Sequence, residues 1–493
     1  MKIKYLVLGV LAYYSCFLFQ QSWLRNDFAV YLLLGRFLAE GKGYFDYFLS
    51  TLHLNVRYPP GYPFLLSIVI RLFGNNLLYP RLLTLILMGI SLYVLINLLG
   101  KYLSKKETFL CFILFSLSPY LLNFTHTVNS DVPYFLFSWF SILFFYDNRY
   151  YLSGRKMWPG ALCAVLAFYM RGIGLSLYLS FLIYVIIKKK ARQAILPLLF
   201  GLAIIPWAIT VLTRPGSYGG VFLTKYEYCP AGGIVGFLDI PLRGLLNLKY
   251  YAGKVISDLV FFPYLNEVTF GNLLFAPKVI LSLLFSFLFL YGFYLSLKDA
   301  GFLEIYVFVY FFLILFWPYH SQHLLLPLYP FLIGYLLIAL RQVRIKFFKF
   351  ALILGLLTVA VAAGFNNFKK LIDNNGSAEP CFAQGFSWID GNTSQGSVIM
   401  SSDPAAVYFY TGRKGAFLEL SRDPGESLAA IKERKVNYIF LEKEAYLVVH
   451  GKKIMDFDKF IKPLLAGYPD YFDLIYTSPD KCGLIVYKVN IPG

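Results

Sequence analysis

"LYPRLLTLILMGISLYVLINLLGKYLSKK" (residues 78–106) decides the class of this protein. Residues 82–100 carry no charged side chain, and a run of about 20 apolar residues is the length that an α-helix needs to cross a bilayer. Lys101, Lys105 and Lys106 follow at once. Lys and Arg are enriched in loops that stay on the cytoplasmic side of a membrane. The stretch therefore predicts a membrane span that ends on the cytoplasmic side.

The same kind of run recurs along the chain. Of its 493 residues, 58% are hydrophobic and only 15% are charged, whereas soluble domains have about 25% charged residues. Apolar runs lie at 5–21, 78–99, 108–123, 131–146, 157–171, 173–187, 194–213, 278–297, 303–317, 323–340 and 347–365. The sequence therefore predicts a polytopic α-helical membrane protein with about 11 transmembrane helices.

The positive charge is distributed as the orientation of a membrane protein requires. Residues 366–493 hold fifteen basic and fifteen acidic side chains, so the whole net charge of +18 lies in residues 1–365. Every second connection is basic, and the intervening short connections carry no Lys or Arg. The basic connections are "KYLSKK" (101–106), "DNRYYLSGRK" (147–156), "KKKAR" (188–192), "SLKDAG" (296–301) and "RQVRIKFFK" (341–349). We expect a cytoplasmic N-terminus, with loops 22–77 and 214–277 outside, and no nucleic-acid partner.

The C-terminal segment 366–493 has a different pattern. Residues 396–402, 436–443 and 482–489 read as strands, and 424–435 as an amphipathic helix. This order predicts a small α/β domain, which an odd number of spans places outside the cytoplasm. The six cysteines lack metal-ligand spacing. Cys381 and Cys482 are candidates for a disulfide, with two free thiols as the alternative.

Ionisable residues gather at the predicted outer ends of the spans. A charge inside a membrane costs about 2.5–3.5 kcal/mol, so such residues usually mark function. The residues concerned are Asp27, Arg57, Asp131, Arg171, His320 and His323. All but Arg57 have a simpler interpretation: the two aspartates could cap helices, Arg171 could snorkel, and the histidines could be interfacial. Their shared location favours one site at the outer face.

Several motifs resemble those of type C membrane glycosyltransferases. An acidic residue follows the first span in "DFAVY" (27–31), and the hook "YPPGYP" (58–63) comes some thirty residues later. The resemblance continues through "LFGNN" (72–76) with "PRLLTLI" (80–86), "LSPYLLNFTHTVNSDVPYFLF" (117–137) and "FYMRGIGL" (168–175). It covers residues 1–365, is strongest in 20–180, and is closest to glycosyltransferase family 39. That group includes protein O-mannosyltransferases and the lipid A aminoarabinose transferase.

The resemblance implies a type C glycosyltransferase fold and an enzyme that uses a polyprenyl-phosphate-linked sugar as donor. The sugar would pass, with inversion, to a lipid, glycan or protein acceptor on the outer face of the cytoplasmic membrane. Loop 22–77 would carry interfacial helices, and "DFAVYLLLGRFLAEG" (27–41) reads as one that lies along the membrane surface. The three prolines of the hook would hold it extended.

The resemblance also implies roles for single residues. Asp27 would be the general base. Arg57, Tyr58, Arg171 and His323 would hold the donor phosphate, for which arginine is suited by its paired donors. Asp131, Tyr31 and His320 would contact the sugar or the acceptor. Lys225 lies in the Gly- and Tyr-rich segment 214–277 and is a further candidate for contact with the acceptor, with a packed cover loop as the alternative. No cofactor is implied, although Asp131 or the histidine pair could seat a divalent metal.

One motif departs from the family. His323 in "HLLLPLYP" (323–330) stands where many relatives have Arg, so phosphate binding here is expected to be weaker or pH-sensitive. Two other functions stay open. A polysaccharide ligase or polymerase would share the lipid-phosphate chemistry. A lipid-linked sugar transporter would line a path through the midplane with polar groups, whereas these runs are apolar at their centres.

Overall fold

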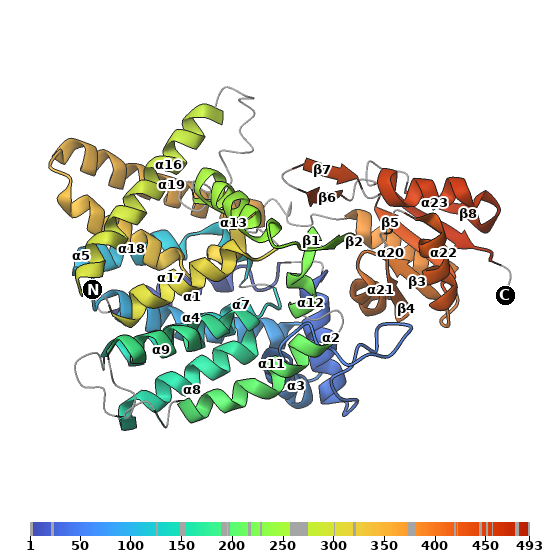
Figure 1. Ribbon diagram of the computed structural model, residues 1–493, viewed down its shortest axis with the longest axis horizontal. Helices are drawn as coiled ribbons and strands as arrows, with labels where there is room; N and C mark the ends of the chain where they lie inside the picture. Colours follow the sequence, from blue (N-terminus) through green and yellow to red (C-terminus); the bar gives the residue numbers. More distant parts are fainter. Residues whose placement is uncertain are drawn as a thin grey trace.

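The computed structural model of the chain combines a helical bundle with a smaller part built on a β-sheet (Figure 1). The structure describes residues 3–491 except 21–23, 125–126, 148–153, 189–194, 196–197, 215–217, 227–228, 257–274, 300, 319–321, 373–379, 419–420, 422, 443–445, 450–451, 456 and 479–482. His320 and Cys482 therefore lie outside the described residues, so the predicted disulfide stays a prediction.

Each predicted apolar run contains an α-helix. In chain order these are α1 (Ile3–Ser15), α4 (Leu78–Leu99), α5 (Lys105–Ser116), α7 (Asp131–Asp147), α8 (Gly154–Met170), α9 (Leu175–Ile187), α11 (Ile205–Thr213), α16 (Phe275–Ser296), α17 (Phe302–Leu315), α18 (Tyr329–Gln342) and α19 (Lys346–Ile372). Within the described residues, two segments are long and apolar enough to cross a membrane by themselves, Leu78–Leu99 and Lys349–Lys369. The count of eleven spans stays a prediction.

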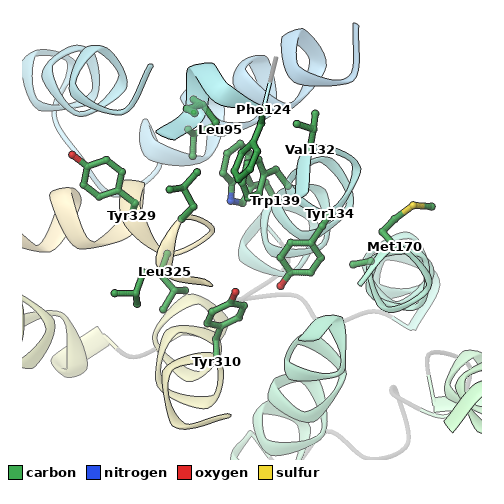
Figure 2. Packing of buried hydrophobic residues seen from close by; sticks show 14 of the residues in the cluster. Leu95, Phe124, Val132, Tyr134, Trp139, Met170, Tyr310, Leu325 and Tyr329 are labelled. Carbon is green, nitrogen blue, oxygen red and sulfur yellow. The ribbon is translucent and has the colours of Figure 1, made fainter. Parts of the chain in front are cut away.

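The centre of the bundle is aromatic. Helix α7 packs between α4 and α8, and Trp139 on α7 is fully buried and stacks on Phe135 with ring centroids 5.1 Å apart. Figure 2 shows Tyr134 of α7 and Tyr310 of α17 with their hydroxyls directed between the two helices. Tyr134 bonds the Tyr306 hydroxyl at 3.1 Å, and Tyr310 donates to the Leu324 carbonyl at 2.8 Å. These bonds satisfy the polar tips of side chains that the core otherwise buries.

Three of the basic connections meet at one end of the bundle. The Glu107 carboxylate accepts two hydrogen bonds from Arg341, at 2.9 and 2.6 Å, and also caps α5 through the Ser104 N–H. This pairing lowers the pKa of Glu107 to about 2. The Tyr146 hydroxyl donates to the Lys101 carbonyl at 3.0 Å. Connections 101–106, 147–156 and 341–349 therefore begin or end on the same side, as the alternation of charge predicts.

Helix α2 (Asp27–Ala39) differs from the prediction of an interfacial amphipathic helix. Residues 29–35 and Phe37 are all buried, so no side of its middle faces lipid. Helix α3 (Gly61–Phe73) packs on one side of α2, and α21 (Pro404–Thr411) from the C-terminal segment covers another. The apolar side chains of "DFAVYLLLGRF" (27–37) pack on α3 and α21. The sequence alone does not distinguish such packing against two helices from insertion into a membrane surface.

The amphipathic helix of this loop is α3. Its exposed apolar side chains, Phe64, Ile68 and Leu72, recur every four residues and so form one stripe. Tyr62, Leu66 and Ile70 on the other side are buried. At 13 residues this helix is too short to span a bilayer. Its stripe suits the surface of the membrane.

Segment 214–277, which the sequence predicts to lie outside, is short helix and hairpin in its described part. It contains α12 (Tyr218–Phe222), β1 (Thr224–Tyr226), β2 (Cys229–Ile234) and α13 (Asp239–Tyr250). Arg243 of α13 is buried and donates to the carbonyls of Phe222 and Phe316 at 3.0 and 3.3 Å. Asn247 donates to the Leu315 and Trp317 carbonyls. These bonds tie the segment to the end of α17.

The C-terminal segment forms a mixed sheet of order β4-β3-β5-β9-β8 within the described residues. Strand β3 is parallel to β4 and β5, and β9 is antiparallel to β5 and β8. The strands are β3 (Val398–Ser401), β4 (Lys414–Phe417), β5 (Tyr438–Glu442), β8 (Phe472–Thr477) and β9 (Leu484–Val489). The helices are α20 (Pro380–Asn392), α21, α22 (Pro424–Glu433) and α23 (Lys462–Gly467). The predicted strands are confirmed as β3, β5 and β9, and the predicted helix as α22.

Candidate active site

Asp27 stands at the start of α2 with its carboxylate accessible to solvent. Asn26 occupies the N-cap position, with φ 50° and ψ −131°. A cap aspartate would accept hydrogen bonds from the first turn of its helix. The Asp27 carboxylate instead accepts a hydrogen bond from the Tyr58 hydroxyl at 2.5 Å. The helix-cap interpretation of Asp27 therefore does not hold.

Tyr58 is held from several sides by the hook. Its N–H donates to Asn55 Oδ1 at 2.9 Å, and its carbonyl accepts from the Tyr44 hydroxyl at 2.7 Å. The ring is buried. Burial, reinforced by the charge of Asp27, raises the pKa of Tyr58 well above its usual value. The hydroxyl therefore keeps its proton and stays a donor to the Asp27 carboxylate.

Asn55 is itself oriented by Asp46. The Asn55 amide donates to Asp46 Oδ1 at 2.8 Å. Burial raises the pKa of Asp46 to about 6, and this hydrogen bond and the charges of His53 and Arg57 oppose the rise. The half-buried carboxylate of Asp46 thus orients Asn55, and Asn55 in turn holds the backbone that carries Tyr58.

Tyr31 connects this pair to the bundle. Its ring meets the edges of Tyr58 and Tyr62 with centroids 5.0 and 5.4 Å apart. Its hydroxyl accepts a hydrogen bond from Ser130 at 2.8 Å. Tyr31 is 3% exposed. Its predicted contact with sugar or acceptor is thus hard to reconcile with its position, which suits a support for Tyr58.

Asp131 and Arg171 form an ion pair between the start of α7 and the break after α8. The Asp131 side chain is 2% exposed and that of Arg171 is 19% exposed. The Asp131 N–H donates to Asn129 Oδ1 at 3.1 Å. Arg171 thus has a buried acidic partner, which a residue that only snorkels to the membrane surface does not need. Asp131 faces the guanidinium and has little surface left for a substrate.

His323 brings the connection between α17 and α18 into the same region. It lies in the 3-10 turn Gln322–Leu325, whose Leu324 carbonyl accepts from Tyr310. The side chain keeps solvent access although protein atoms crowd it. The surrounding protein atoms remove hydration from the charged imidazole and lower the pKa of His323 to about 4. The charge of Arg171 also lowers this pKa, and the charge of Asp27 opposes the fall. His323 is therefore within electrostatic reach of both residues and is neutral near pH 7.

The remaining predicted residues are less central. The Arg57 guanidinium lies 5.7 Å from the centre of the Tyr58 ring, on the approach to the hook. Lys225 belongs to β1, and its side chain is not described. His320 lies outside the described residues, so the metal pairing with His323 stays a prediction. Among the residues that the structure describes, no group of three or more His, Cys, Asp or Glu side chains could hold a metal ion.

Two supporting residues carried no signal in the sequence. Ser130 is identified only by its bond to Tyr31, because a serine before an aspartate reads as a helix start. Gly61 of the hook packs on the end of α8, where an added Cβ would lie 2.6 Å from the Tyr169 carbonyl oxygen. That contact places the hook beside Arg171. A glycine in "PPGYP" could equally have been a turn residue.

Comparisons with known proteins identify the fold. Residues 57–213 match the family described as dolichyl-phosphate-mannose-protein mannosyltransferase. ArnT from Cupriavidus metallidurans bound to undecaprenyl phosphate matches with a TM-score of 0.56 over 99% of this chain and 98% of that one, at 12% identity. Its apo state matches with a TM-score of 0.59, over 98% and 97%, at 11% identity. The fold is that of the type C membrane glycosyltransferases.

A second type C structure extends the likeness. The archaeal oligosaccharyltransferase AglB from Archaeoglobus fulgidus, in complex with an inhibitory peptide and a dolichol-phosphate, matches with a TM-score of 0.54 at 13% identity. The match covers 99% of this chain and 75% of that one. No curated protein matches the chain by sequence. The chain is thus a membrane protein with the type C fold, and its chemistry has to be argued from its own residues.

The type C fold brings six of the predicted residues into one connected set. Asp27 bonds Tyr58, Tyr58 packs on Tyr31, and Ser130 joins Tyr31 to the start of α7. There Asp131 pairs with Arg171, whose charge, like that of Asp27, acts on His323. The set thus combines an accessible carboxylate, which can accept a proton, with a partly exposed guanidinium and a neutral imidazole, which can bind an anion.

Proposed function

We propose that this protein is a glycosyltransferase that moves a sugar from a polyprenyl-phosphate carrier to an acceptor on the outer face of the cytoplasmic membrane. The observation that carries the proposal is the connected set of Asp27, Tyr58, Arg171 and His323, at the opposite end of the bundle from the Glu107–Arg341 pair. The type C fold, and the family match over residues 57–213, support a lipid-linked donor.

Asp27 is the proposed general base. The acceptor's hydroxyl or amine attacks the anomeric carbon, its proton passes to the Asp27 carboxylate, and the bond from that carbon to the phosphate oxygen breaks. Attack from the face opposite the leaving group inverts the anomeric configuration. Tyr58 holds the carboxylate by donating to one oxygen, which fixes its direction and leaves the proton on the tyrosine.

Arg171 is the proposed anchor of the leaving phosphate. A guanidinium has five N–H donors, so pairing with Asp131 leaves donors for an anion on its exposed side. The developing charge on polyprenyl phosphate then meets a cation that is already oriented. Neutral His323 adds an N–H donor, and Arg57 lies on the approach beside Tyr58. Asp131 takes the role of orienting Arg171 rather than binding the sugar.

The test is sugar transfer by purified protein in nanodiscs, with a synthetic polyprenyl-phosphate sugar as donor. Asp27→Asn keeps the acceptor oxygen for Tyr58 but removes the base. General base help is worth about 10²–10⁴-fold, so we expect turnover to fall by that amount while donor binding persists. Asp470→Asn, a change at an exposed residue of the C-terminal segment, is the control and should keep normal turnover.

Other outcomes would favour the rival functions. Normal transfer by Asp27→Asn would remove this residue from the mechanism. Release of a lengthened or ligated glycan from a lipid-linked oligosaccharide, with no transfer of single sugars, would indicate a polymerase or ligase. Movement of intact lipid-linked sugar across the bilayer, unaffected by Asp27→Asn, would indicate a transporter.

A further inference from the structure

The backbone just before Asp27 adopts an unfavourable conformation. Asn26 has φ 50° and ψ −131°, a region in which a side chain with Cβ is rarely found. Such a residue costs about 1–3 kcal/mol and persists only where its surroundings hold it. Among the described residues that are not glycine, only Lys435 shares a positive φ. Something must therefore hold Asn26 in place.

The residue that holds Asn26 comes from the other end of the chain. The Asn26 N–H donates to Asp403 Oδ2 at 2.6 Å, across 377 positions of sequence. The Asp403 Oδ1 accepts from the Ala406 N–H at 3.1 Å and so caps α21. The carboxylate is buried, 8% exposed, and its Oδ2 lies 3.9 Å from Arg25 Nε. One carboxylate thus joins the start of α21 to the start of α2.

Neighbouring contacts fix the same two elements. The Leu24 N–H donates to the Tyr410 hydroxyl at 2.7 Å. The Arg36 guanidinium lies 4.8 Å from the centre of the Phe409 ring. Both side chains that α21 contributes here follow Asp403 on the same short helix. Helix α21 therefore holds the segment before Asp27 at two backbone N–H groups and covers α2 further along.

The sheet of the C-terminal segment continues into the first outer loop. Gly415 of β4 donates to the Phe48 carbonyl at 2.7 Å and accepts from the Ser50 N–H at 2.9 Å. A Cβ on Gly415 would lie 2.3 Å from Pro404 Cβ, so β4 and the start of α21 are in close contact. Loop 22–77 is thus attached to the C-terminal segment on both sides of α2. The burial of Asp403 raises the pKa of its carboxyl, and the charge of Asp27 adds to the rise.

We propose that Asp403 is a positioning residue for Asp27: its carboxylate holds the strained Asn26 backbone, so that the C-terminal segment sets the direction of the catalytic carboxylate. This inference rests on the proposed role of Asp27 as base. Asp403 touches neither donor nor acceptor in this account. It acts by fixing one peptide group. Without Asp403, Asn26 would relax to a common backbone conformation, and the direction of the Asp27 carboxylate would change.

The decisive variant is Asp403→Asn. A carboxylate offers two acceptor oxygens, one for Ala406 and one for Asn26, whereas an amide offers one and turns a donor toward the other N–H. A misplacement of about 1 Å can cost 10²-fold in rate, so we expect kcat to fall about 10–100-fold with little change in donor Kd. Asp423→Asn is the matched control, because Asp423 caps α22 through the Gly425 N–H at 2.8 Å.

A second substitution gives a test that a merely structural role would fail. Glycine adopts positive φ without strain, so Asn26→Gly removes the need for a partner to hold this conformation. When Asn26→Gly is added to Asp403→Asn, we expect at least half of the loss in log(kcat) to be restored. When it is added to Asp423→Asn, we expect no restoration of kcat. Hydrogen exchange of the amides of residues 24–30 should speed up in Asp403→Asn and stay unchanged in Asp423→Asn, with no sugar present.

The outcomes separate this inference from the function on which it rests. Wild-type kcat and unchanged amide exchange in Asp403→Asn, while Asp27→Asn is inactive, would overturn the positioning role alone. Equal losses in Asp403→Asn and Asp423→Asn, without rescue by Asn26→Gly, would reduce Asp403 to a helix cap and also overturn it. Normal transfer by Asp27→Asn would instead overturn the proposed function, and the exchange experiment would still report whether Asp403 holds Asn26.

Discussion

At the scale of single residues, the site depends on which groups carry charge at neutral pH. The sequence resemblance leads us to expect Arg at position 323, where the chain has His323, and the loss of hydration among the surrounding protein atoms holds the pKa of this imidazole at about 4. The imidazole is then a neutral donor near pH 7. The folded protein binds this proton less readily than the unfolded chain, so the stability that neutral His323 contributes is present above pH 6.5 and is lost as the pH falls toward 4.

Donor binding should become tighter as the pH falls, whereas the stability of the protein should decrease. A phosphodiester donor keeps one negative charge over this pH range, and its arrival beside His323 should raise the imidazole pKa. If the rise is about two units, to about 6, linkage makes binding about tenfold tighter at pH 5 than at pH 7. We expect this in donor-binding titrations without acceptor. His323→Arg should bind with little pH dependence, and an equal pH dependence in both proteins would place the titrating group elsewhere.

The Asp131–Arg171 pair makes a second prediction at this scale. Removing the partner of a buried charge costs about 3–5 kcal/mol, because the remaining charge has no compensation. Arg171→Ala should therefore lower the unfolding temperature in detergent strongly, since the Asp131 side chain is 2% exposed. Adding Asp131→Asn should recover most of that loss. Transfer should stay low in the double variant, because the cation is absent. Recovered transfer would show that Arg171 serves the fold alone.

At the scale of elements, the sequence predicted the helices better than their partners. Apolar periodicity located the bundle helices and the strands β3, β5 and β9, because these patterns are local. It did not distinguish α2, buried by α3 and α21, from an amphipathic helix on a membrane surface. The contact of Asn26 with Asp403 joins residues 377 positions apart. No local pattern encodes such a contact. The hydrogen bond by which Asp403 holds the backbone before Asp27 could therefore not be predicted from the sequence.

The contact between α3 and α8 gives a prediction for the hook. In Gly61→Ala the new Cβ would meet the Tyr169 carbonyl oxygen at 2.6 Å and Met170 Cε at 2.9 Å. Overpacking of this kind costs about 1–3 kcal/mol, and the shift would move Tyr58 away from Arg171. We expect a lower unfolding temperature and reduced transfer.

The matched control for Gly61→Ala is Gly9→Ala in α1. A Cβ at Gly9 meets nothing within 4 Å, and Ala favours a helix over Gly by about 1 kcal/mol. This variant should be neutral or slightly more stable, with normal transfer. If Gly61→Ala behaves in the same way, α3 does not depend on close contact with α8 to place the hook.

At the scale of the whole molecule, the charged groups divide between the two ends of the bundle. One end has the basic connections with the Glu107–Arg341 pair, and the other has Asp27, Asp131, Arg171 and the C-terminal sheet attached to loop 22–77. The centres of the helices are apolar, as an enzyme acting at one membrane face requires and a path across the membrane does not. From the positive-inside rule we expect the site to lie at the outer face.

Cysteine labelling of intact cells tests this orientation. In a variant without its native cysteines, Lys414→Cys on β4 and Arg344→Cys between α18 and α19 would each give one exposed thiol. A charged maleimide that does not cross membranes should label Lys414→Cys in intact cells. It should label Arg344→Cys only after permeabilisation, and Asp470→Cys should behave like Lys414→Cys because both lie on the C-terminal segment. The reverse pattern would put the C-terminal segment and the Asp27 site in the cytoplasm. The basic connections would then lie outside the cell, contrary to the positive-inside rule. Equal labelling of Lys414→Cys and Arg344→Cys in intact cells would mean an even number of spans between them, and the count of eleven would be wrong.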